Sequence, residues 1–104
     1  MKLVSLLEKL EYTCLQGSTD QEVKNVIYDS RKVEDGSLFI CIRGAVVDGH
    51  KFVPDVIAKG AKVLVVEEAV EAPEDVTVIL VKDTRYAMAF ISAAYFGHPA
   101  EKLK

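Results

Sequence analysis

The chain has 104 residues, of which 50% are hydrophobic and 28% are charged, and its formal net charge is -3. This length and composition are typical of one small folded domain with one hydrophobic core, which argues against a disordered chain. The 13 basic and 16 acidic residues are mixed along the chain and form no basic stripe for a phosphate backbone. We therefore expect a single domain over residues 1–104 and no nucleic-acid partner.

The sequence carries no signal for a membrane or for secretion. Its longest uncharged, mostly apolar stretch, residues 86–96, is far shorter than the ~20 residues that span a bilayer. Glu8 and Lys9 interrupt the apolar residues near the N-terminus, so no signal-peptide core is present and a cytoplasmic location without a membrane partner is expected. Cys14 and Cys41 have neither metal-ligand spacing nor a neighbouring histidine, which predicts reduced thiols and no metal site.

The first half of the chain predicts one helix and two strands. Leucines recur at helical spacing over residues 3–10, which predicts a short amphipathic helix that packs on a sheet. Residues 23–28 are rich in β-branched and aromatic side chains and end at the polar segment 29–31, which is typical of a strand. The continuous apolar run 38–42 predicts a central strand that is covered on both faces.

A βαβ unit is predicted in the middle of the chain. Apolar residues recur at helical spacing over residues 50–59, Pro54 suits the first turn, and Gly60 suits the end of a helix. The apolar run 63–66 follows directly and predicts a second buried strand, parallel to the strand over residues 38–42.

The last third of the chain predicts a further strand over residues 76–81 and a final helix that Asp83 or Thr84 caps. Gly97 and Pro99 are expected to end that helix. Together, these elements predict an α/β fold: a small three-layer domain with a mixed, largely parallel sheet built around a βαβ unit.

Polar side chains at the end of the first predicted strand form one candidate binding site. Ligands of open α/β sheets bind outside the carboxyl ends of the strands, which is where residues 28–31 are expected. The Ser30 hydroxyl and the Arg31 guanidinium could bind a polar heterocycle or an anion. The alternative is an ordinary turn, because Asp29 and Ser30 are common turn residues that bond their own backbone.

The segment 43–50 between a strand and a helix is the second candidate. Gly44 and Gly49 let the backbone approach a ligand closely, and N–H groups near a helix start favour phosphate or carboxylate oxygens. The sequence has neither a G-x-G-x-x-G run nor a Gly-Lys-Ser/Thr phosphate loop. A plain connector between the strand and the helix is therefore the alternative.

Other polar residues favour structural roles. His50, near a helix start, is expected to cap or pack, because no nucleophile or carboxylate accompanies it as a recognisable catalytic set. Glu67 and Glu68 have no third ligand at a defined spacing, which favours a solvated surface over a metal site.

Short polar and glycine-bearing motifs occur along most of the chain in a definite order. They are Tyr-Asp-Ser-Arg-Lys-Val at 28–33, Gly-Ser-Leu-Phe-Ile-Cys-Ile-Arg-Gly at 36–44, Asp-Gly-His-Lys-Phe at 48–52, Lys-Gly-Ala at 59–61, Val-Lys-Asp-Thr-Arg-Tyr-Ala-Met-Ala at 81–89 and Ala-Tyr-Phe-Gly-His-Pro at 94–99. In this order and spacing the motifs resemble the N-terminal domain of the Mur ligases over about residues 23–103. Within the family, the Cys-Ile-Arg-Gly stretch and the closing segment are most similar to the ligase that adds the third peptide residue.

The resemblance implies the first domain of a three-domain cytoplasmic ligase of peptidoglycan synthesis. This domain would bind the UDP moiety of UDP-N-acetylmuramoyl-L-alanyl-D-glutamate, and the other domains of the ligase would be its partners. The implied reaction is ATP-dependent amide-bond formation that adds meso-diaminopimelate or L-lysine. ATP and Mg²⁺ would bind a central domain whose glycine-rich loop is absent from this sequence, so this segment alone is expected to be inactive and to hold no catalytic residue.

The resemblance also assigns substrate contacts by motif position. Tyr28 and Ser30 would contact the uridine, while Ala45, Val46 and Val47 would contact the UDP-sugar. Because those last three side chains are apolar, their backbone N–H groups would supply the hydrogen bonds.

Arg31 and Arg43 are possible helpers for the diphosphate. Each lies beside one of the two candidate segments, and the guanidinium group is well suited to phosphate oxygens.

A second hypothesis is a freestanding α/β regulatory or protein-interaction domain, such as a receiver-like module. It rests on fold class and size alone. A receiver needs an acidic cluster and a phosphoacceptor aspartate at the strand ends, which the segment 43–50 fits poorly.

Overall fold

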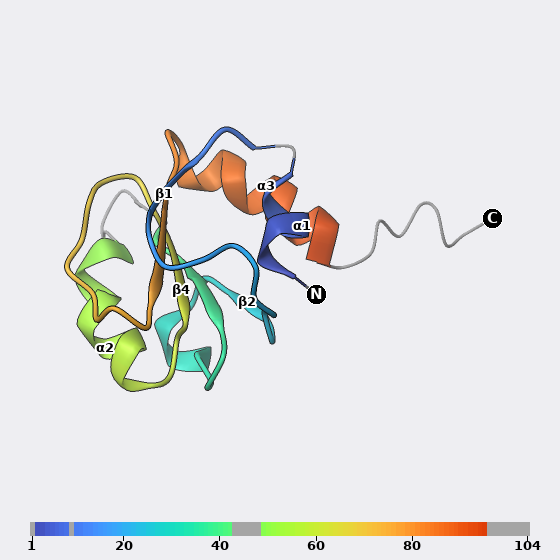
Figure 1. Ribbon diagram of the computed structural model, residues 1–104. Helices are drawn as coiled ribbons and strands as arrows, with labels where there is room; N and C mark the ends of the chain where they lie inside the picture. The colour runs from blue at the N-terminus through green and yellow to red at the C-terminus, as the bar shows by residue number, and fades with distance from the viewer. Residues whose placement is uncertain (1, 9, 43–48, 96–104) are drawn as a thin grey trace.

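The computed structural model describes residues 2–8, 10–42 and 49–95. In this part of the chain a five-stranded sheet lies between two layers of helices (Figure 1). The elements are α1 (Leu3–Leu7), β1 (Thr13–Gln16), β2 (Val26–Ile27), the 3₁₀ helix η1 (Ser30–Lys32), β3 (Leu38–Ile40), the 3₁₀ helix η2 (Gly49–Phe52), α2 (Val53–Ala58), β4 (Val63–Val66), β5 (Thr77–Leu80) and α3 (Thr84–Tyr95).

The sheet is mixed and largely parallel, as predicted. Its strand order is β1-β5-β4-β3-β2. Strands β2, β3, β4 and β5 are parallel to one another, and the edge strand β1 pairs antiparallel with β5. Strands β3 and β4 with helix α2 form the predicted βαβ unit. Because the four parallel strands run the same way, their carboxyl ends share one edge of the sheet, where ligands of such folds bind.

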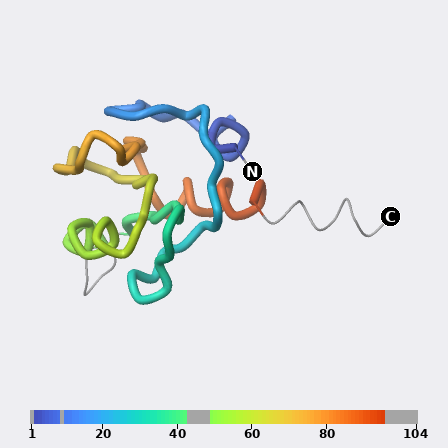
Figure 2. Tube along the Cα trace, turned by 60° about the horizontal axis from the view of Figure 1, so that its bottom comes forward, coloured from blue at the N-terminus to red at the C-terminus, as the bar shows by residue number. Residues whose placement is uncertain are grey.

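Strand β4 lies at the centre of the sheet and shows how both faces are buried. Val63 and Val65 point into the core beneath α1 and α3, whereas Leu64 and Val66 point into the core beneath α2. All four side chains are fully buried. Helix α1 packs against α3 on one face while α2 covers the other, which completes the three layers (Figure 1 and Figure 2).

The predicted helices are present but differ in length. The helix expected over residues 3–10 is regular only at Leu3–Leu7, and the one expected over 50–59 begins with the 3₁₀ turn η2. Pro54 lies in the first turn of α2, as predicted. Gly60 ends that helix with φ +109°, and a Cβ there would lie 2.6 Å from Asp35 Cα, so this position requires glycine.

The strand expected over residues 23–28 is shorter than predicted. Only Val26 and Ile27 pair with β3, although Val23 is buried in the core beneath α1. Asp83 caps α3 as one of the two expected residues, because its Oδ1 accepts a hydrogen bond from the Arg85 N–H at 2.9 Å.

Strand β1 was not predicted from the sequence. Thr13, Cys14 and Leu15 are all exposed, so this edge strand lacks the apolar run or the alternation that marks the other strands. The Gln16 side chain ties β1 to the loop before β5 by donating to the carbonyls of Pro73 at 2.7 Å and Val76 at 2.8 Å.

Neither cysteine forms a disulfide bond, and Cys14 is exposed while Cys41 is buried. In the part of the chain that the structure describes, no helix is long and apolar enough to cross a membrane. The same residues bring no three histidine, cysteine or acidic side chains together as a metal site.

We expect the substitution Leu64→Ala to lower the free energy of unfolding by about 2–5 kcal/mol, because it opens a cavity beneath α2. Leu15→Ala is the matched control, since Leu15 is 42% exposed and its loss should change stability by about 0.5 kcal/mol or less. Urea denaturation of both variants measures the difference. Equal losses in the two variants would contradict the assignment of β4 as the centre of the core.

Candidate functional site

A hollow of about 450 Å³ lies at the carboxyl ends of β2 and β3. It brings together three residues that the sequence analysis selected: Tyr28, Ser30 and Arg31. All three follow β2 directly, where the chain leaves the sheet and turns into η1. The remaining lining residues are Asp29, Ile42, Gly49 and Phe52.

Two hydroxyl groups in this hollow have no hydrogen bond to any described residue. The Tyr28 side chain is 65% exposed, and Ser30 is half-buried at the start of η1. A hydroxyl both donates and accepts hydrogen bonds, so these two groups can bond to a ligand that presents carbonyl and N–H groups side by side.

Asp29 shapes the turn that carries Ser30. Its Oδ1 accepts from the Arg31 backbone N–H at 3.0 Å and from Arg31 Nε at 3.1 Å, while Oδ2 accepts from Nη2 at 2.9 Å. These bonds lower the pKa of Asp29 to about 2, mainly through the Arg31 side chain. The expected turn is therefore present together with the hollow, and the two interpretations of residues 28–31 are compatible.

The second predicted segment meets the same hollow at both of its ends. Four of the predicted site residues lie outside the described residues: Arg43, Ala45, Val46 and Val47. Ile42 and Gly49, which flank the segment 43–48, both line the hollow, and the Gly49 N–H donates to the Ile42 carbonyl at 2.8 Å. A Cβ at Gly49 would lie 2.8 Å from Ile42 N, so only glycine permits this close approach.

Glu67, expected on a solvated surface, instead links three elements at the same edge. Its Oε2 accepts from both the N–H and the Oγ1 of Thr84 at 2.8 Å, which anchors the start of α3 at the end of β4. His50 Nε2 accepts from the Glu67 N–H at 2.9 Å, so the histidine links η2 to the end of β4 through a hydrogen bond. The Glu67 and Thr84 contact joins residues 17 positions apart, so no local sequence pattern indicated this role.

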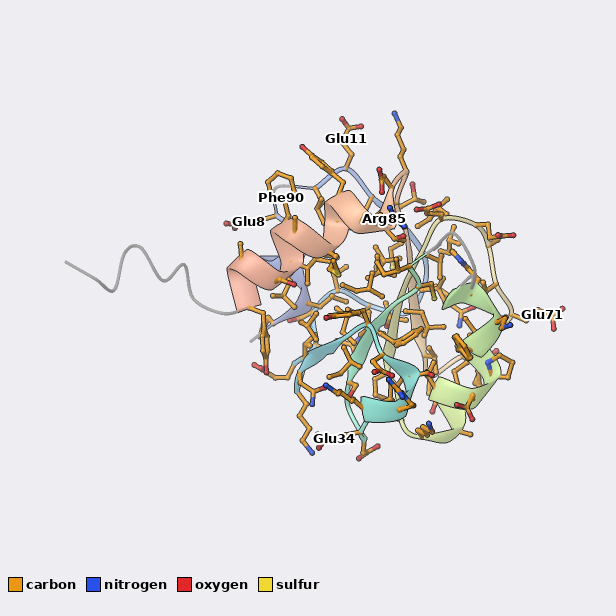
Figure 3. The ribbon with its side chains drawn as sticks, turned by 180° about the vertical axis from the view of Figure 1, so that it is seen from behind. Glu8, Glu11, Glu34, Glu71, Arg85 and Phe90 are labelled. Carbon is orange, nitrogen blue, oxygen red and sulfur yellow. The ribbon has the colours of Figure 1, made fainter. Side chains whose placement is uncertain are left out.

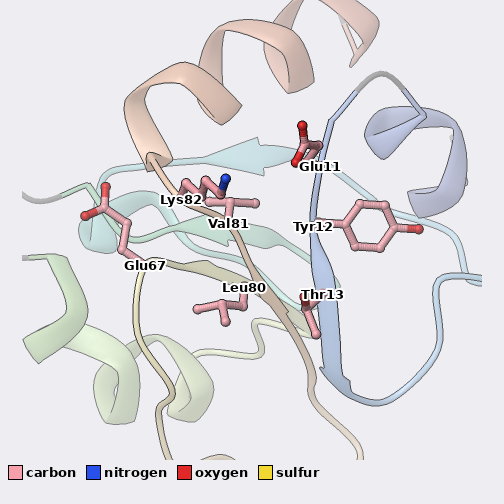
Figure 4. A pocket seen from close by; sticks show the side chains of 7 residues that line it. All are labelled: Glu11, Tyr12, Thr13, Glu67, Leu80, Val81 and Lys82. Carbon is pink, nitrogen blue, oxygen red and sulfur yellow. The ribbon is translucent and has the colours of Figure 1, made fainter.

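A second hollow of about 360 Å³ lies between the ends of β4 and β5 and the start of β1 (Figure 4). Its charged side chains are the carboxylates of Glu11 and Glu67 and the ammonium of Lys82. Because acidic groups outnumber basic ones, this hollow is a poorer site for a diphosphate than the hollow beside Arg31. Its full lining is Glu11, Tyr12, Thr13, Glu67, Leu80, Val81 and Lys82.

The chain is a three-layer α/β domain with a polar hollow at the carboxyl edge of its sheet. Residues 22–96 match the family model described as "Mur ligase family, catalytic domain". The UDP-N-acetylmuramoyl-L-alanyl-D-glutamate--2,6-diaminopimelate ligase of Clostridium perfringens is 50% identical over 104 residues, which are 100% of this chain and 22% of that ligase. The ligase of the same name from Clostridioides difficile is 46% identical over 98% of this chain and 21% of its own length.

A solved structure of a Mur ligase has the same fold. Crystal structure II of MurF from Acinetobacter baumannii superimposes with a TM-score of 0.80 and 28% sequence identity, over 95% of this chain and 21% of that one. The chain therefore belongs to the Mur ligase family, and it spans about a fifth of the length of the relatives that it matches. The resemblance found in the sequence is confirmed, including its leaning toward the ligase that adds the third peptide residue.

The Asp29 carboxyl is expected to titrate near pH 2, below its ordinary value of 3.8, because ionisation keeps the contact with Arg31. The ion pair should persist at pH 4 and be lost as the pH falls through about 2. Replacing Arg31→Met removes the side-chain bonds and should move the pKa back toward 3.8, whereas Lys2→Met should leave it unchanged. Carboxyl carbon chemical shifts follow this titration, and a midpoint near 3.8 in the unaltered chain would refute it.

The substitution Glu67→Ala should lower the free energy of unfolding by about 1.5–3 kcal/mol, because the buried Thr84 loses a charged acceptor for two donors. Glu71→Ala removes the same charge from an exposed loop (Figure 3) and should cost about 0.5 kcal/mol or less. Thermal and urea denaturation compare the two variants. If both unfold alike, Glu67 does not anchor α3.

Proposed function

We propose that this chain binds the UDP end of UDP-N-acetylmuramoyl-L-alanyl-D-glutamate for a ligase of peptidoglycan synthesis. The observation that carries the proposal is the hollow at the carboxyl ends of β2 and β3, where two available hydroxyls and a guanidinium lie together. Membership of the Mur ligase family and relatives named for that UDP-linked substrate support it. The same findings favour this function over a freestanding regulatory module.

The residues of the hollow match the parts of a uridine diphosphate. The Ser30 hydroxyl can bond the carbonyl or N–H edge of uracil, and the exposed Tyr28 ring offers a surface on which the base can stack. Asp29 already balances the charge of Arg31, but an exposed guanidinium with five N–H donors has further donors for a diphosphate oxygen.

The segment after β3 would complete the site. Ala45, Val46 and Val47 lie in sequence between Ile42 and Gly49, which both line the hollow. Their side chains offer no hydrogen bonds, so we propose that their backbone N–H groups bind the sugar and the diphosphate, with Arg43 as a further cation.

The larger ligase would join an amino acid to the D-glutamate end of this substrate in the cytoplasm, at the expense of ATP and with Mg²⁺. The names of the relatives favour 2,6-diaminopimelate over L-lysine as that amino acid. None of the six glycines in this sequence is followed by lysine, so the chain has no Gly-Lys-Ser/Thr phosphate loop. This segment would therefore hold the substrate, while ATP binds in the other domains of the ligase.

Isothermal titration calorimetry of the chain with UDP-N-acetylmuramoyl-L-alanyl-D-glutamate tests the proposal. We expect binding, and Ser30→Ala should raise the Kd about three- to tenfold, because one hydrogen bond to the base is lost. Ser92→Ala, on α3 at the opposite face of the sheet, is the matched control and should leave the Kd unchanged. No heat at millimolar ligand, or equal affinities of the two variants, would overturn the assignment.

A further inference from the structure

We infer that Lys59 is a positioning residue for the uridine site, although it does not line the hollow. The inference rests on the proposed function and deepens it, because it assigns a residue that sets the geometry of Ser30. Lys59 lies at the C-terminal end of α2, 29 positions after Ser30 in the sequence. Its Nζ donates a hydrogen bond to the backbone carbonyl of Ser30 at 2.9 Å.

The ammonium group of Lys59 is itself held in place. It forms an ion pair with Asp55 Oδ2 at 3.3 Å, one helical turn earlier on α2. The Lys59 side chain is 38% exposed, so part of it packs against the protein. Lys59 thus connects a regular helix to a turn that has no strand or α-helix of its own to fix it.

The peptide group between Ser30 and Arg31 is held at both of its polar ends. Its carbonyl oxygen accepts from Lys59 Nζ at 2.9 Å, and its N–H donates to Asp29 Oδ1 at 3.0 Å. A peptide group is planar, so two bonds on opposite sides restrict its rotation and with it the ψ angle of Ser30. That backbone setting fixes the direction of the Ser30 Cα–Cβ bond, from which the hydroxyl extends at the edge of the hollow.

These two bonds form a clamp on the Ser30–Arg31 peptide group. The clamp favours binding because less conformational entropy is lost when the groups that contact a ligand are already ordered. The Asp29 half of the clamp is local to the turn, whereas the Lys59 half comes from a different layer of the fold. Removing Lys59 is therefore expected to loosen Ser30 relative to Ile42 and Phe52 on the other side of the hollow.

Calorimetric titration with UDP, using Lys59→Met and Lys59→Arg, tests the inference. Methionine keeps the length of the side chain and removes the donor, so we expect the Kd to rise about fivefold. Arginine retains N–H donors and should restore affinity to within about twofold of the unaltered chain. Lys62→Met is the matched control, because it removes the same charge from a side chain that is similarly exposed, at 43%. Lys62 pairs with Asp75 near the start of β4, away from the hollow.

A double-mutant cycle separates positioning from a general effect on stability or charge. In the Ser30→Ala background there is no hydroxyl to place, so Lys59→Met should then change the Kd by less than about twofold. If Lys59 served only the end of α2, its loss would lower thermal stability and leave the Kd unchanged, which would overturn the inference. The inference also fails if Lys59→Met and Lys62→Met weaken binding equally. If the unaltered chain binds no UDP, the proposed function itself is contradicted.

Discussion

The structure depends on the burial of a parallel sheet on both of its faces. Because α1 and α3 cover one face and α2 the other, the central strands β3 and β4 carry only apolar side chains. Polar chemistry is then confined to the strand ends. Tyr28, Ser30 and Arg31 at the end of β2 lie at such a position, as does Glu67 at the end of β4.

The two ends of that edge serve different purposes. At the end of β4, the polar groups of Glu67 form hydrogen bonds within the protein: its carboxylate accepts from Thr84 and its N–H donates to His50. At β2, the backbone of the turn is satisfied by Asp29 and Lys59 while the hydroxyls of Tyr28 and Ser30 have no described partner. The proposed site at β2 thus combines a fixed backbone with side-chain hydroxyls that are available to a ligand.

Sequence patterns were sufficient to predict the strands that are buried along nearly their whole length. The apolar runs of β3, β4 and β5 identified the sheet, and polar residues directly after β2 identified the hollow. Strand β1 was missed because an exposed edge strand such as Thr13–Gln16 carries no apolar pattern. The contact between Lys59 and Ser30 could not be predicted either, because a bond between residues 29 positions apart depends on tertiary packing that no local pattern encodes.

The bond between the Gly49 N–H and the Ile42 carbonyl joins the two residues that flank segment 43–48, and both of these residues line the hollow. Joining the two ends of a segment costs little more when residues are added, because the entropy of closure grows only slowly with length. Insertions or substitutions between these two residues can therefore reshape the proposed site while the strand order of the sheet behind it stays the same. The close approach that only Gly49 permits holds the two ends of the segment together whatever lies between them.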